Sequence, residues 1–106
     1  MRRAFISIPV KNRTREEIEA QLKRMKEIAI FKLDDRVEFI NTTILDRMPY
    51  DTKFEAVWYL GKSIQLLSQC DTLVCLKNID NKYNGCIIEK EIAKRYGLYI
   101  VEVDLW

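Results

Sequence analysis

Short apolar runs alternate along the chain with longer stretches in which apolar residues recur every three or four positions. The runs lie at residues 4–8, 37–41, 72–76 and 98–103 and predict four strands, of which the third is the most continuously apolar. The stretches between them predict three amphipathic helices. The chain is therefore expected to read strand–helix–strand–helix–strand–helix–strand.

Start and stop signals agree with the predicted helices. Residues 14–17 (Thr-Arg-Glu-Glu) and residues 52–55 (Thr-Lys-Phe-Glu) both have the spacing of a capping box. The first helical pattern is broken at Asp34–Asp35, and the third stops at Gly97, the residue type favoured just after a last helical turn. The apolar positions that define the helices are Ile18, Leu22, Met25 and Ala29, then Val57, Leu60, Ile64 and Leu67, and last Ile88, Ile92 and Tyr96.

Strands that alternate with helices predict a parallel sheet built by right-handed crossovers. We expect one domain over residues 1–106 with a three-layer, Rossmann- or flavodoxin-like α/β fold. Its sheet should have about four strands in the order 2-1-3-4, with helices on both faces. Ligands of such sheets bind beyond the carboxyl ends of the strands, where the strand order reverses. The loops at residues 9–13 and 77–85 should flank this crevice.

Composition excludes several classes of function. A net charge of +2 is too small for a protein that binds duplex nucleic acid, and no apolar run approaches the length of a membrane span. The absence of histidine removes histidine-based triads and His–zinc sites. Three cysteines without Cys-x-x-Cys spacing predict reduced thiols in a cytoplasmic protein. We expect neither a metal nor a cofactor.

The loop after the first strand is a candidate phosphate site. It carries Lys11 and Arg13 and leads into a helix N-terminus, where backbone amides and the helix dipole favour an anion. A solvated loop with ordinary surface charges is the alternative, because the glycines of a P-loop are absent.

Glu89 is the candidate nucleophile. It lies near the start of the third predicted helix, where the dipole favours an ionised carboxylate. A glutamate that serves only the helix start is the alternative.

Among the aromatic residues, Tyr50 and Tyr83 lie in loops and are candidates to stack on a base. Trp58 and Tyr59 are more typical of helix packing or of a subunit interface.

Four short motifs follow one another along the chain. They are residues 5–10 (Phe-Ile-Ser-Ile-Pro-Val), residues 58–63 (Trp-Tyr-Leu-Gly-Lys-Ser), Cys70-Asp71, and Asn84-Gly85-Cys86 followed by Glu89 and Ala93. Together they resemble a group of small bacterial and phage proteins related to nucleoside 2-deoxyribosyltransferases, and the resemblance covers nearly the whole chain.

The resemblance implies a site for the N-glycosidic bond of a nucleoside or nucleotide. Glu89 would attack the anomeric carbon and form a glycosyl-enzyme intermediate. Two positions depart from the family: Ser63 stands where the transferases have an aspartate, and Phe5 where they have an orienting tyrosine. The candidate substrate-binding residues, from the loops and the motifs together, are Ser7, Pro9, Lys11, Arg13, Tyr83, Asn84 and Gly85.

Two functions follow from this. The first is an enzyme, a nucleoside deoxyribosyltransferase or nucleotide N-glycosidase, that cleaves or transfers the bond. The second is a non-catalytic protein that sequesters a nucleotide or a nucleotide-derived signal, for example one encoded by a phage. The two departures favour the second, and a purely structural interaction module is a third alternative.

The chain is also expected to form a homodimer or larger assembly. It ends in Leu105-Trp106, and leaving such side chains in water forgoes the free energy of burial. Trp58 and Tyr59 add aromatic surface of the kind enriched at interfaces. The resemblance implies the same, because the characterised relatives assemble through helices.

Overall fold

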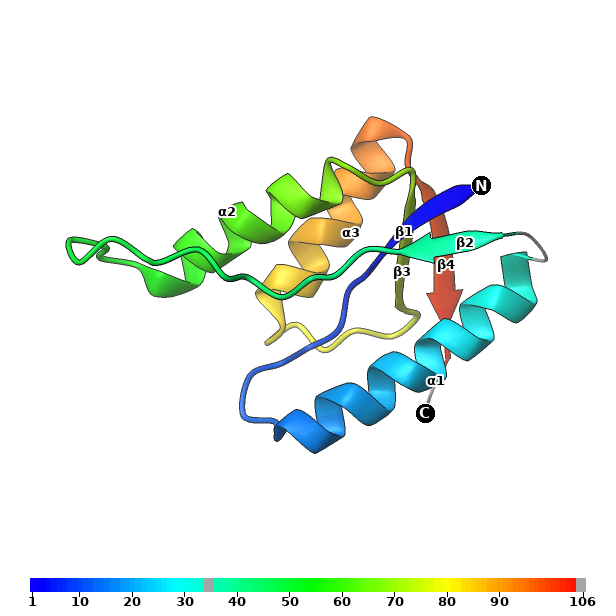
Figure 1. The fold of residues 1–106 in the computed structure, drawn as a ribbon, viewed down its shortest axis with the longest axis horizontal. Coiled ribbons are helices and arrows are strands. Elements are labelled where there is room, and N and C mark those ends of the chain that lie inside the picture. The colour runs from blue at the N-terminus through cyan, green and yellow to red at the C-terminus, as the bar shows by residue number, and fades with distance from the viewer. Residues whose placement is uncertain (34–35, 105–106) are drawn as a thin grey trace.

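Strands and helices alternate strictly along the chain. The computed structural model describes residues 1–33 and 36–104, which form β1 (Arg2–Ile6), α1 (Arg15–Leu33), β2 (Val37–Phe39), α2 (Glu55–Leu67), β3 (Thr72–Leu76), α3 (Asn84–Tyr96) and β4 (Tyr99–Val103). The strands pair in parallel in the order β2-β1-β3-β4 (Figure 1). The predicted α/β fold and strand order are confirmed.

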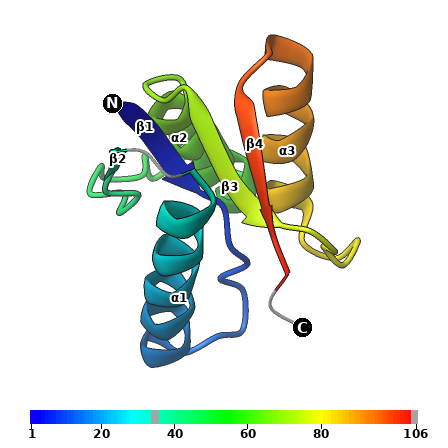
Figure 2. The ribbon, with the colours of Figure 1, turned by 90° about the vertical axis from the view of Figure 1, so that its right-hand side faces the viewer.

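Helices cover both faces of the sheet. In β1, Ala4 and Ile6 pack with α1, whereas Phe5 packs on the opposite side with α2 and α3, since successive side chains of a strand point to opposite faces. Figure 2 shows α1 on one side of the sheet and the other two helices behind it. β3 is covered on both faces, and all of its residues are buried.

The first capping box forms and the second does not. The Glu17 backbone N–H donates to Thr14 Oγ1 at 3.1 Å, and the Thr14 hydroxyl donates to the Glu17 carboxylate at 3.2 Å. Thr52 instead belongs to a turn in which its backbone N–H donates to the Pro49 carbonyl at 3.1 Å. α2 starts later, after Phe54, and has no side-chain cap. The predicted cap at Thr52 was therefore wrong.

The buried face of α3 differs from the predicted apolar stripe. Cys86, Glu89 and Ala93 are its buried residues, while Ile88 and Tyr96 are exposed. The small side chains of Cys86 and Ala93 let the helix lie close to the sheet, which larger residues would prevent. Glu89 consequently lies within the buried face of α3 and not at its border.

The amino-terminal part of α2 extends beyond the sheet together with residues 41–54 (Figure 1). Val57, expected in the core, is exposed for this reason, whereas Leu67 at the other end of the helix is buried. An ion pair of 2.5 Å between Lys62 and Asp46 ties the extended segment to α2.

Two features of the sequence fall outside the described residues, namely Asp34–Asp35 and Leu105–Trp106. Assembly into a dimer therefore stays a prediction. Trp58 and Tyr59 contact each other edge to face, with ring centroids 5.0 Å apart. Within the part of the chain that the structure describes, no helix is both long and apolar enough to cross a membrane.

Two glycines should respond oppositely to alanine. Gly97 ends α3 with a positive φ of 78°, so Gly97→Ala should lower the free energy of unfolding by about 1–2 kcal/mol. Gly61 lies within α2, and nothing stands within 4 Å of an added Cβ, so Gly61→Ala should raise it by roughly 0.5–1 kcal/mol. Urea denaturation of both variants measures the two shifts, and a stabilised Gly97→Ala protein would contradict the assignment of the helix end.

Candidate functional site

A cleft of about 520 Å³ lies beyond the carboxyl end of β1. Its walls come from the end of β1 and the loop after it, residues 42 and 44, α2, and the start of α3. The predicted site residues that line it are Ser7, Pro9, Lys11, Tyr83, Asn84, Gly85 and Glu89. This is the place expected for a ligand, beside the point where the strand order reverses between β1 and β3.

A buried hydrogen bond joins Ser7 to Glu89 inside the cleft. The Ser7 hydroxyl donates to Glu89 Oε1 at 2.6 Å, and the two residues are only 2% and 6% exposed. Ser7 directly follows β1, and its backbone N–H donates to the Val74 carbonyl of β3 at 2.8 Å. The sheet therefore fixes the Ser7 hydroxyl, and the carboxyl group of Glu89 points towards Ser7 and the end of β1.

Burial changes the acidity of Glu89. It raises the pKa of the carboxyl from 4.5 to about 7, although the hydrogen bond from Ser7 acts in the opposite direction. The sequence placed Glu89 in or near the first turn of the helix, where the dipole would favour the ionised form. It lies instead one turn further into α3, so the cost of desolvation outweighs the dipole.

The hydroxyl that holds Glu89 comes from Ser7, one of the predicted site residues. The resemblance implies a tyrosine at position 5, and Phe5 carries no hydroxyl, although it does line the cleft. Ser7, two residues along the same chain segment, supplies the hydrogen bond instead.

Cys86 is a cleft residue that the sequence did not single out. It is buried, lines the cleft and lies on the same face of α3 as Glu89. Burial raises the pKa of its thiol, the Ser7 side chain lowers it, and the charge of Glu89 raises it further. Its spacing of three residues from Glu89 is a signal that could have identified it, because residues i and i+3 share a helix face.

Three further residues of the cleft were not predicted to bind a ligand. Lys82 belongs to the loop before α3, and its ammonium lies 5.1 Å from the centre of the Tyr83 ring. Tyr59 and Ser63 line the cleft from α2. Tyr50, in contrast, is fully exposed and lines neither this cleft nor the hollow beside it.

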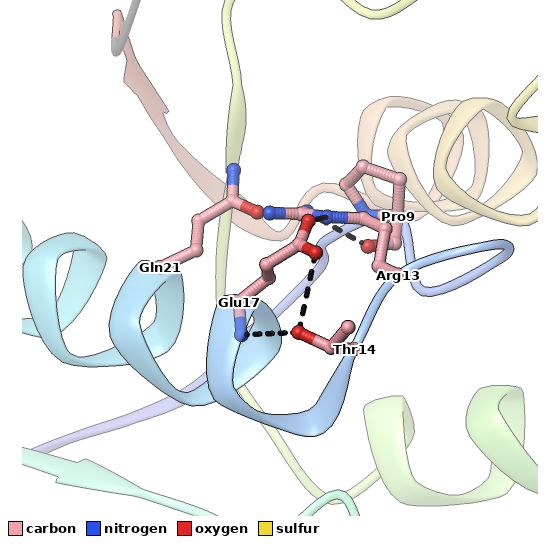
Figure 3. A network of polar contacts seen from close by, with 5 residues as sticks. All are labelled: Pro9, Arg13, Thr14, Glu17 and Gln21. Atoms are coloured by element: carbon pink, nitrogen blue, oxygen red, sulfur yellow. Dashed lines mark hydrogen bonds and ion pairs between the residues drawn. The ribbon is translucent and has the colours of Figure 1, made fainter.

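Arg13 lies outside the cleft. Asn12 adopts a positive φ of 60°, and the Arg13 guanidinium donates to the Pro9 carbonyl at 3.0 Å and to the Gln21 side chain (Figure 3). It also lies 3.9 Å from the Glu17 carboxylate. Arg13 thus fastens the loop to α1, and of the predicted site residues it is the one that lines the adjoining hollow and not the cleft.

A second hollow of about 440 Å³ adjoins the cleft. It is lined by Arg13 and by the loop between β3 and α3, and it shares Pro9, Lys82 and Tyr83 with the cleft. Glu17 and Asp80 also line it, so its charges are mixed. Within residues 1–33 and 36–104, no three Cys, Asp or Glu side chains are grouped so that they could hold a metal ion.

Comparison with protein-family models, with curated proteins and with solved structures finds no significant match to this chain. The resemblance to the deoxyribosyltransferases therefore stays a prediction.

The raised pKa of Glu89 should make the protein less stable as the pH rises. The folded protein holds the Glu89 proton more tightly than the unfolded chain does, and this tighter binding stabilises the fold. The stabilisation is fully present below pH 4.5 and is lost as the pH rises through about 7. The loss should amount to about 3 kcal/mol in the free energy of unfolding.

Urea denaturation at pH 4.5 and pH 8 measures this loss. The Glu89→Gln variant should not show it, whereas Glu91→Gln should behave as the native protein, because Glu91 is exposed on the same helix and pairs with Arg95 at 2.7 Å. An equal pH dependence in all three proteins would contradict the assignment.

Proposed function

We propose that the chain binds a nucleoside or nucleotide in the cleft and cleaves or transfers its N-glycosidic bond, with Glu89 as the nucleophile. The observation that carries the proposal is a buried glutamate held by the Ser7 hydroxyl inside a ligand-sized cleft. Carboxylates are the usual nucleophiles at anomeric carbons, and they act without histidine.

The cleft residues suggest how a nucleotide would bind. Tyr59 and Tyr83 present aromatic rings on which a base could stack, and Lys11 and Lys82 supply positive charge for a phosphate. The Ser7 hydroxyl holds Oε1 of Glu89, which leaves Oε2 to attack the anomeric carbon. The attack would form a glycosyl ester, and water or a second base would then displace the Glu89 carboxylate from the anomeric carbon.

Binding without turnover is the second candidate, and the lining of the cleft favours it. Glu89 is the one carboxyl among the described residues that line the cleft, and Ser63 on the α2 wall supplies no acid for a departing base. In that case the same cleft would sequester a nucleotide, and Glu89 would donate a hydrogen bond to it.

Base release distinguishes the two candidates. The protein is incubated with nucleosides and nucleoside 5′-monophosphates, and free base is measured by liquid chromatography. Native protein should release base, Glu89→Gln should lose roughly 10³-fold or more of the rate, and Glu91→Gln should keep it. The rate should also rise as the pH increases through about 7, because ionised Glu89 is the reactive form.

Absence of base release from every compound, together with a ligand-induced rise in melting temperature, would reject the enzyme and support the binding protein. Release that survives Glu89→Gln would remove Glu89 from the role of nucleophile.

Phosphate recognition should depend on the lysines of the cleft. Lys11→Ala and Lys82→Ala should each weaken binding of 5′-monophosphates by roughly tenfold, because a hydrogen bond to a charged group is lost, and should affect nucleosides little. Calorimetry in the Glu89→Gln background measures both without turnover. Lys23→Ala, on the exposed face of α1, is the control, and equal losses for both ligand types would show that the lysines do not contact phosphate.

A further inference from the structure

The cleft offers a nucleophile but no second acid. Glu89 is the one carboxyl group among the described residues that line it, and the chain has no histidine. Ser63 lines the wall at the position where the resembling transferases carry an aspartate. Glu17 and Asp80 line the neighbouring hollow instead of the cleft.

The remaining side chains of the cleft protonate a leaving group poorly. They are lysine, tyrosine, asparagine and hydroxyl side chains and the Cys86 thiol, whose pKa is raised by burial. Purines and pyrimidines depart as anions unless an acid protonates them during bond cleavage. General acids contribute roughly 10²–10⁴-fold to such steps, so this cleft should cleave ordinary nucleotides slowly.

Resting on the proposed glycosidic chemistry, we infer that the substrates of this cleft are N-ribosylpyridinium nucleotides, whose base departs as a neutral molecule and needs no proton. A carboxylate oxygen of Glu89 bonds to C1′ while the C1′–N bond breaks. The electron pair of the broken bond passes to the ring nitrogen and cancels its positive charge. Water then displaces Glu89 from C1′, and one proton enters the solvent for each bond cleaved.

The charges of the cleft suit such a substrate. A cationic ring beside Glu89 favours the ionised carboxylate, so binding of the substrate itself would activate the nucleophile. The ring of Tyr59 lines the same cleft, and aromatic faces attract cations. Lys11 and Lys82 remain for the phosphate.

The neighbouring hollow provides room for a second nucleotide. It shares Pro9, Lys82 and Tyr83 with the cleft and has a volume of about 440 Å³. A pyridinium dinucleotide could therefore place its nicotinamide riboside next to Glu89 and its other half in the hollow. A pyridinium mononucleotide would fill the cleft alone.

The test compares nicotinamide mononucleotide and nicotinamide adenine dinucleotide with adenosine and cytidine 5′-monophosphates. Free base is measured by liquid chromatography, and proton release is measured with an indicator in weak buffer. Nicotinamide should be released with a kcat/KM about 10²-fold or more above that for adenine or cytosine, with one proton per bond. Glu89→Gln should abolish this release, and Glu91→Gln should not alter it, with circular dichroism to verify that both variants fold.

The outcomes separate this inference from the function on which it rests. Release of adenine or cytosine as fast as nicotinamide, dependent on Glu89, would overturn the pyridinium class and leave the glycosidic function standing. No base release from any compound would overturn both. Nicotinamide release that persists in Glu89→Gln would also overturn the inference. Cleavage of the dinucleotide but not of the mononucleotide would support the inference and assign the hollow to the second nucleotide. Equal cleavage of the two compounds would support the inference and show that the substrate needs only the cleft.

Discussion

A carboxyl group that is buried in a protein must find a hydrogen-bond donor or pay the full cost of desolvation. Glu89 meets this requirement through Ser7, and the arrangement depends on the sheet, because Ser7 is itself held by the Val74 carbonyl of the neighbouring strand. The central pair of parallel strands thus determines where the carboxyl group of α3 lies. The position of Glu89 follows from this buried contact, whereas its raised pKa follows from the burial that the contact only partly offsets.

The fold was predictable because it depends on the periods of apolar residues and on the handedness of crossovers, both of which the sequence carries. The directions in which individual side chains point were less predictable. The pattern favoured Ile88 as a core residue of α3, but close packing selected the smaller Cys86 and Ala93 and turned Glu89 inward. The loop charge of Arg13 suggested a phosphate site, yet its guanidinium is satisfied by a carbonyl and a side-chain amide of its own surroundings. Which side chains are buried and which partners a charged group finds depend on tertiary contacts between residues distant in the sequence.

The two sides of the cleft are held by different forces. Ser7 and Glu89 belong to elements packed on the sheet and are almost fully buried. The opposite wall includes residues of the 41–54 segment and α2, where the visible ties are the Lys62–Asp46 ion pair and the Lys62 ammonium 5.6 Å from the Trp58 ring. Partly exposed charged contacts of this kind contribute little stability. Ser7 and Glu89 thus belong to the packed part of the molecule, whereas the 41–54 segment is joined to α2 by a partly exposed ion pair.

The pairing of β1 with β3 has a consequence for how the protein is made. Ala4 aligns with Thr72 in the register of the two strands, and the contact between Ser7 and Glu89 spans 82 positions of the chain. Ribosomes add about 5–20 residues per second, so the apolar β1 leaves the ribosome several seconds before its central partner exists. During that interval the edge of β1 that later pairs with β3 is open to other chains. The cleft can form only after α3 has been synthesised, so a nascent chain that stalls before α3 lacks the Ser7–Glu89 contact.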